Sequence, residues 1–191
     1  MWAVVGLGNP GRRYADNRHN VGFMFIKELA GAWGVSVKKA RFRSKTAEAR
    51  RSGEPVVLVL PQTYMNASGE AVGELVRGLR LEPERLLVVY DDIDLPLGEI
   101  RVRKSGGPGT HRGMASIVEE VGTTGFPRLR IGIRPDSESG DIVRFVLSPF
   151  RRDERATLAR SLGAAREALE MIIAGRMDAA MNRYNGAVPA D

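Results

Sequence analysis

Cysteine is absent from this chain of 191 residues, and histidine occurs only twice. Without thiols there is no disulfide framework and no thiolate chemistry, so we expect a cytosolic chain. No apolar run approaches the roughly 18 residues that suggest a membrane span. Residues 1–5 are mostly apolar and carry no basic leader, which predicts a first strand instead of a signal peptide. These absences favour a cytoplasmic protein that does not contact membranes.

Motifs of several enzyme classes are missing as well. There is no H-E-x-x-H pattern and no cluster of cysteine and histidine, so no zinc site is predicted. The serine motif G-x-S-x-G of many hydrolases is absent. The glycine-rich run 106–109 lacks the lysine and the serine or threonine of a Walker phosphate loop. Any hydrolytic chemistry must therefore come from other residues.

A dinucleotide-like motif lies at residues 6–11 (Gly-Leu-Gly-Asn-Pro-Gly), which match G-x-G-x-x-G after a strand. In a true dinucleotide site this loop opens a helix directly. Here residues 12–18 separate the loop from the first predicted helix. NAD binding is therefore disfavoured. A nucleotide-dependent oxidoreductase stays an alternative that NAD binding at micromolar concentration would revive.

Positive charge is in excess: 29 lysines and arginines face 23 acidic residues, for a net charge of +6. A basic balance favours a polyanionic partner, either nucleic acid or an anionic membrane surface. Arg101 and Arg103 lead into the loop 105–110, and Arg128, Arg130 and Arg134 alternate on one predicted strand, so they share a face. These two basic edges suit phosphates, but a solvated edge of the sheet explains them equally well.

Strand and helix patterns alternate along the chain. Apolar or alternating strands are predicted at 2–6, 55–60, 86–90, 98–104 and 129–133, and helices at about 21–30, 66–80, 111–121 and 153–174. We expect an α/β fold: a single-domain three-layer sandwich over residues 1–191, with a mixed, largely parallel twisted sheet and helices on both faces. A C-terminal helical segment is expected at about 151–185. The sequence leaves open whether the polar residues 135–145 form a lid.

The two histidines, His19 and His111, each end a loop just before a predicted helix. A neutral imidazole can take a proton from water, which suffices for hydrolysis without a metal or a covalent nucleophile. Such a base needs a carboxylate to hold its tautomer, and Asp91 ends an apolar strand where it can do so. Taken alone, His19 as a helix cap and Asp91 as a solvated turn residue remain simpler interpretations.

Asn9 and Asn66 lie at two strand-to-helix junctions. An uncharged amide can hold a substrate carbonyl or the attacking water and can stabilise an oxyanion. The structural alternatives are a turn residue before Pro10 for Asn9 and a helix cap for Asn66; Asn20 is likewise a candidate helix cap. Both interpretations of each asparagine stay open at this point.

Six segments together resemble the motifs of bacterial-type peptidyl-tRNA hydrolases. They are 5–11 (Val-Gly-Leu-Gly-Asn-Pro-Gly) with Tyr14 and 18–22 (Arg-His-Asn-Val-Gly), 61–69 (Pro-Gln-Thr-Tyr-Met-Asn-Ala-Ser-Gly), 91–98 (Asp-Asp-Ile-Asp-Leu-Pro-Leu-Gly), 105–113, 128–133 and 146–150. The match runs in order over nearly the whole chain, so it is far more specific than any one motif.

The resemblance implies an enzyme that hydrolyses the ester between a peptide and the 3′ end of tRNA. His19 would be the general base, and Asp91 would keep it basic and oriented. The implied substrate-binding residues are Asn9, Tyr14, Tyr64, Asn66, His111 and Arg112, and the implied tRNA phosphate contacts are Arg101, Arg103 and Arg130. The resemblance further implies a cytoplasmic monomer that uses no metal and no organic cofactor and whose partner is peptidyl-tRNA.

The chain departs from the family pattern in the fourth motif. The family commonly has His-Asn-Gly where this chain has His111-Arg112-Gly113, and Pro108 and Thr110 replace the commoner histidine and glycine. Arginine cannot accept a hydrogen bond, so the role of the family's asparagine is in question and a cation near the tRNA 3′ end is the alternative. A non-catalytic RNA-binding protein on the same scaffold is the second hypothesis.

Overall fold

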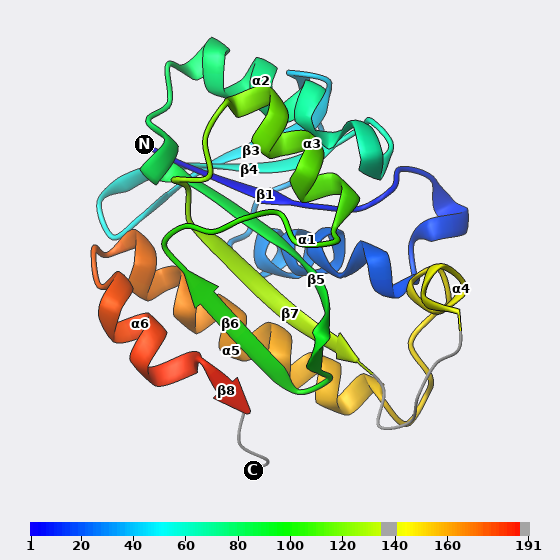
Figure 1. Cartoon of the computed structure of the whole chain (residues 1–191). Helices are drawn as coiled ribbons and strands as arrows, with labels where there is room; N and C mark the ends of the chain where they lie inside the picture. The colour runs from blue at the N-terminus through cyan, green and yellow to red at the C-terminus, as the bar shows by residue number, and fades with distance from the viewer. Residues whose placement is uncertain (135–140, 188–191) are drawn as a thin grey trace.

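One sheet of eight strands forms the centre of the computed structural model, which describes residues 1–134 and 141–187 (Figure 1). The strand order is β2-β3-β4-β1-β5-β7-β6-β8. The strands are β1 (Trp2–Gly6), β2 (Lys39–Arg41), β3 (Ser44–Arg51), β4 (Glu54–Pro61), β5 (Leu86–Pro96), β6 (Glu99–Arg103), β7 (Arg128–Arg134) and β8 (Gly186–Ala187).

Six α-helices and four short 3-10 helices connect the strands in the described part of the chain. The α-helices are α1 (Val21–Ala32), α2 (Ser68–Leu79), α3 (Arg112–Val121), α4 (Ile142–Val146), α5 (Arg155–Ile173) and α6 (Met177–Tyr184). The 3-10 helices are η1 (Arg12–Tyr14), η2 (Arg18–Asn20), η3 (Met65–Ala67) and η4 (Pro83–Arg85).

The centre of the sheet is parallel and its flanks are antiparallel. β1 pairs in parallel with β4 and β5, and β5 pairs in parallel with β7. β3 and β6 run antiparallel to their neighbours at the two sides. The predicted mixed α/β sheet is confirmed. Because the four central strands point the same way, their carboxyl ends and the loops that follow meet at one edge.

Alternation along the strands produces two apolar cores, one on each face of the sheet. Val4 packs on the side of α1, α5 and α6, whereas Ala3 and Val5 pack on the side of α2 and α3. The two groups of helices lie on opposite faces of the sheet (Figure 1), so the three-layer prediction is confirmed. In the described residues no helix is both long and apolar enough to cross a membrane.

Glycine at position 22 lets α1 begin directly against the sheet. A Cβ atom there would lie 2.4 Å from both the Leu7 nitrogen and the Val89 oxygen, closer than any side chain tolerates. The start of α1 is therefore held against the end of β1 and against Val89 of β5. His19 lies in the 3-10 turn immediately before α1, so the same close contact brings it to the edge where β5 carries Asp91.

The structure differs from the sequence prediction in several elements, since β2, β3, β8 and α4 were not predicted and β5 is longer than expected. β5 does not end at Tyr90 but continues to Pro96, with its register against β7 shifted between Asp92 and Pro96. β2 is a fully exposed three-residue edge strand and α4 has only five residues, so neither has the apolar periodicity that prediction needs. Of the candidate lid 135–145, residues 135–140 lie outside the described residues and α4 begins at Ile142.

Candidate active site

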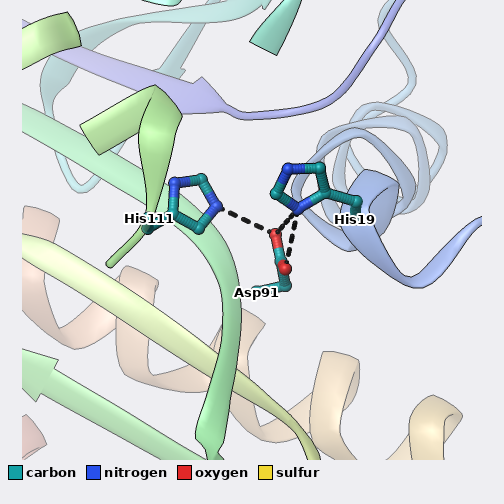
Figure 2. Close-up of side chains that lie close together, drawn as sticks. All are labelled: His19, Asp91 and His111. Atoms are coloured by element: carbon teal, nitrogen blue, oxygen red, sulfur yellow. Dashed lines mark hydrogen bonds and ion pairs between the residues drawn. The ribbon is translucent and has the colours of Figure 1, made fainter. Parts of the chain in front are cut away.

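Asp91 receives hydrogen bonds from both histidines of the chain (Figure 2). Nδ1 of His19 lies 2.8 Å from Asp91 Oδ2 and 2.9 Å from Oδ1. Nε2 of His111 lies 3.1 Å from Asp91 Oδ1. The carboxyl side chain is only 3% exposed, while the His19 side chain keeps 16% of its surface accessible. The structure thus brings His19, Asp91 and His111 together at the carboxyl edge of the sheet.

Asp91 is ionised in this arrangement. Burial alone opposes the charged form, but the interactions with His111 and His19 outweigh it and hold the pKa of the carboxyl well below its usual range. A carboxylate can only accept hydrogen bonds, so the facing nitrogen of His19, Nδ1, carries the proton. In a neutral His19 ring, Nε2 then has a free lone pair. That nitrogen points away from Asp91 (Figure 2).

A cavity of about 480 Å³ opens beside this cluster. Of the site residues that the resemblance implies, those that line it are His19, Asp91, His111, Arg103, Arg112 and Arg130. The rest of the wall comes from the glycine-rich loop 105–110, three apolar residues of α4, and Tyr90, Asp92, Ile93, Asp94 and Arg128 of β5 and β7. A group with a basic nitrogen, an anionic orienting partner and several cations therefore share one concave site, as acid–base chemistry on an anionic substrate requires.

Asn9 is held by two neighbours and keeps one donor group free. Its backbone nitrogen and oxygen bond to the side chain of Asn20 at 2.9 and 2.8 Å, and its Oδ1 accepts the backbone N–H of Met65 at 2.8 Å. Its amide nitrogen Nδ2 has no partner among the described residues and remains able to donate. Asn20 occupies the cap position of α1 but makes no capping bond, because its side chain serves Asn9 instead.

Arg128 is a structural residue and not a surface cation. It is 2% exposed, and its guanidinium donates to the backbone oxygens of Gly107 at 2.9 Å and Thr124 at 3.1 Å. Its position opposite Arg103 on the neighbouring strand puts it under the glycine-rich loop. Part of the predicted basic face is therefore used to hold the loop that forms one wall of the cavity.

The other predicted residues lie farther from the histidines. Arg130 is ion-paired with the buried Asp92, and Arg101 pairs opposite it on β6. Tyr64 is 55% exposed, and Asn66 is exposed at the start of α2. Tyr14 is half-buried in η1. In the described chain, Asn9, Tyr14, Tyr64, Asn66 and Arg101 do not line the cavity that contains His19.

His19, Asp91 and His111 are the one group in the described residues whose ligand-type atoms lie close enough to hold a metal, all within 4.8 Å of one another. The bonding around His111 does not fit that use. Its Nδ1 accepts the backbone N–H of Met114 at 3.2 Å, whereas a histidine bound to metal through Nε2 carries a proton on Nδ1. The cluster therefore fits two N–H groups donating to a carboxylate.

Comparison with known proteins assigns this chain to a family. The sequence profile described as peptidyl-tRNA hydrolase matches residues 3–190. The chain belongs to the peptidyl-tRNA hydrolase family. The peptidyl-tRNA hydrolase of Chloroflexus aggregans is 48% identical over 97% of this chain and 99% of its own, and that of Alkaliphilus metalliredigens is 46% identical over 97% and 100%.

A solved member of the peptidyl-tRNA hydrolase family has the same fold. The crystal structure of the Acinetobacter baumannii enzyme superposes with a TM-score of 0.93 at 34% identity, covering 100% of this chain and 97% of that one. The likeness extends over the whole chain, so it supports both the family assignment and the fold predicted from the sequence.

The sequence did not indicate that Asn20 and Arg128 support the site. Asn20 was interpreted as a helix cap, and Arg128 as one of several surface cations. Asn20 and Asn9 are 11 positions apart across an irregular loop, so no helix or strand periodicity could have indicated their contact. For Arg128, the apolar neighbours Phe126, Pro127 and Leu129 were an available signal of burial.

Proposed function

We propose that this chain hydrolyses the ester bond between a peptide and the 3′ end of tRNA, with His19 activating the attacking water. One observation carries the mechanism: His19 Nδ1 lies 2.8 Å from the buried carboxylate of Asp91, while no described residue bonds to its Nε2 and the residue lines the cavity. That is the geometry of a general base whose tautomer is held by an anionic partner.

The reaction follows from this geometry in two proton transfers. Nε2 of His19 takes a proton from water as the water oxygen bonds to the ester carbonyl carbon. The resulting imidazolium is stabilised by Asp91, and the carbonyl oxygen becomes an oxyanion. When the tetrahedral intermediate collapses, the carbon–oxygen bond to the tRNA ribose breaks and the imidazolium returns the proton to that ribose oxygen. The products are the free peptide acid and tRNA, and His19 is again neutral.

Asn9 is the proposed donor to the substrate carbonyl. Its Oδ1 is committed to the Met65 N–H, which orients the amide so that Nδ2 is the free end. A donor fixed before the reaction stabilises a developing oxyanion without a cost of reorganisation. Asn66, one residue beyond Met65, is proposed to hold the substrate next to the ester. Tyr14 and Tyr64 are proposed to receive the terminal nucleotide and the peptide.

The tRNA is proposed to lie along the basic strands β6 and β7. Arg101 pairs opposite Arg130, and residues directly opposite on adjacent strands project to the same face. Phosphate contacts are independent of sequence, which suits an enzyme that accepts many tRNAs. Arg103 and Arg112 lie at the cavity and form no ion pair with a described residue, whereas Arg130 shares its charge with Asp92.

The compartment and the assembly state are proposed as cytoplasm and monomer. The absence of cysteine suits a reducing compartment. Sedimentation velocity at assay concentration should give a single species of monomer mass, and a dimer would contradict this part of the proposal.

The decisive test compares hydrolysis of N-acetyl-aminoacyl-tRNA by the wild type and by His19→Asn. The asparagine amide can still donate to Asp91 but cannot act as a base, so the buried carboxylate stays satisfied and the fold is kept. We expect turnover to fall by about 10³-fold or more. Unblocked aminoacyl-tRNA and an EDTA-treated sample serve as controls; the activity should be confined to the blocked ester and should survive EDTA.

A negative result is equally informative. If the His19→Asn protein retains wild-type turnover, His19 is not the base. If the wild type binds tRNA but releases no N-acetyl-amino acid, the chain is an RNA-binding protein on this scaffold and Arg112 becomes the first residue to revert to asparagine.

A further inference from the structure

His111 has a position in this site that neither capping nor substrate contact accounts for. Both of its ring nitrogens already have protein partners: Nδ1 accepts the Met114 backbone N–H at 3.2 Å, and Nε2 faces Asp91 Oδ1 at 3.1 Å. The ring is 10% exposed. No ring nitrogen is left for a substrate, so the residue acts through what it holds.

The Met114 contact determines the protonation state of the ring. An N–H group donates into Nδ1, so Nδ1 must present its lone pair, and the single proton of the neutral ring sits on Nε2, where it is donated to Asp91. A second proton, on Nδ1, would place the Nδ1–H group opposite the Met114 backbone N–H, so the hydrogen bond that caps α3 would be lost. The positive end of the α3 dipole and Arg112, next in the chain, oppose a positive ring, whereas the Asp91 carboxylate 3.1 Å from Nε2 favours one, so the assignment of the tautomer depends on the Met114 contact.

The two histidines therefore play different parts toward the same carboxylate. His19 keeps one ring nitrogen without a partner among the described residues, while both ring nitrogens of His111 are bonded. One bond to Oδ1 from His111, added to the paired contacts from His19, stops the carboxylate from rotating about its own bond. The ring of Tyr90 lies edge-on to His111, with centroids 4.9 Å apart and planes at 64°, and restrains the imidazole plane.

We infer that His111 is a positioning residue, locked as the neutral Nε2–H tautomer by capping α3, that aligns Asp91 toward His19 and takes no proton in the reaction. This inference rests on the proposed function of His19. The titratable and charged groups that face the ring are His19 from η2, Tyr90 and Asp91 from β5, and Arg112 on α3 itself. Arg128 of β7 reaches the ring only through Tyr90, whose pKa is raised by burial.

Two substitutions separate the two hydrogen bonds of this ring. Oδ1 of asparagine stands where histidine has Nδ1, so His111→Asn keeps the cap and loses the donor to Asp91. Nε2 of glutamine stands where histidine has Nε2, so His111→Gln keeps the donor and loses the cap. Each variant is the control for the other, since both remove the ring and its contact with Tyr90.

We expect His111→Asn to lose about 10- to 100-fold in kcat with little change in KM, as for a lost hydrogen bond to a charged group. Its Tm should stay near that of the wild type. Without the His111 donor the carboxylate holds the His19 proton more tightly, so the acid limb of the kcat/KM profile should move to higher pH. His111→Gln should keep both kcat and the acid limb near wild type but lower Tm by about 2–6 °C.

Wild-type kcat and an unmoved acid limb in His111→Asn would overturn the inference and leave the ring only a capping role. Equal loss of rate in both variants with no shift of the acid limb would overturn it as well, because the bond to Asp91 would then not matter. Imidazole nitrogen NMR gives a readout independent of activity. The neutral ring of His111 should carry its proton on Nε2; a proton on Nδ1 would refute the tautomer lock even if the chain proved not to be a hydrolase.

Discussion

Two parts of the cavity differ in how their side chains are held: the inner wall, formed by His19, Asp91 and His111, and the rim, formed by Arg103 and Arg112. At the inner wall, both carboxylate oxygens of Asp91 are bonded to ring nitrogens at 2.8 to 3.1 Å. At the rim, Arg103 and Arg112 make no ion pair with any described residue. This difference follows from the two tasks. Proton transfer needs side chains in a fixed geometry, whereas attraction of a polyanion needs only cationic side chains that are accessible to it. Substitutions at the wall should therefore change kcat, and those at the rim should change KM and its salt dependence.

Among these substitutions, replacement of Asp91 by asparagine should cause the largest loss of kcat. The amide that replaces the carboxylate can donate to His19 Nδ1, which would place the His19 proton on Nε2 and remove the basic lone pair from the cavity. We expect kcat to fall by about 10³- to 10⁴-fold with KM little changed. Steady-state kinetics on N-acetyl-aminoacyl-tRNA measures this. A loss confined to KM would mean that the wall binds substrate instead of activating water.

Asn20→Ala should have an intermediate effect, because it acts on the wall through Asn9. The change leaves the buried backbone nitrogen and oxygen of Asn9 without partners, at a cost of about 2–4 kcal/mol in the free energy of unfolding. We expect kcat to fall by about tenfold or more as the Asn9 amide loses its orientation. Chemical denaturation and turnover measure the two effects.

Asn17→Ala is the matched control for Asn20→Ala. Asn17 is an equally short polar residue of the same loop, 9% exposed, and its side chain makes no hydrogen bond to another described residue. Its loss should cost under about 1 kcal/mol and leave kcat unchanged. If the two variants behave alike, the Asn9–Asn20 pair has no special role.

Arg112→Gln should have the smallest effect and should act only on the rim. Arg112 is exposed, so its proposed contact with a tRNA phosphate would lower the slope of log(kcat/KM) against log[salt] by about one unit when removed, with kcat unchanged. Arg77→Gln is the control: Arg77 is an exposed arginine of α2 outside the cavity, paired with Glu120. A fall in kcat at all salt concentrations would instead place Arg112 in the chemistry.

Much of this protein was predictable from short-range patterns. Runs of apolar residues predicted β1 and β4 to within a residue or two, because the centres of these strands are apolar and buried on both faces. β7 was predicted equally well, because apolar side chains at 129, 131 and 133 alternate along it. The helices α2, α3 and α5 followed from apolar spacing on one face. β5 was predicted too short, because Asp91 and Asp92 look like the end of a strand although the neighbouring β7 keeps them in the sheet.

The candidate residues were predictable as types but not as partners. Order along the chain and resemblance of motifs singled out His19, Asp91 and His111, and chemistry suggested a base with a carboxylate. Nothing in the spacing indicated that His111 shares the carboxylate, because the three residues come from separate segments, 72 and 20 positions apart from Asp91. The same limit hid the contact of Asn20 with Asn9.

By itself, the sequence determined the alternation of strands and helices, the absence of thiol chemistry and the positive charge, since each depends on residue type and local period. The different roles of residues of the same type, two arginines and two histidines, became visible only in the tertiary structure. Arg128 became a buried support while Arg103 stayed at the rim, and His111 became a fixed donor while His19 kept a free nitrogen. The physical reason is that burial and hydrogen-bond partners are set by segments that meet only when the sheet and its loops are assembled.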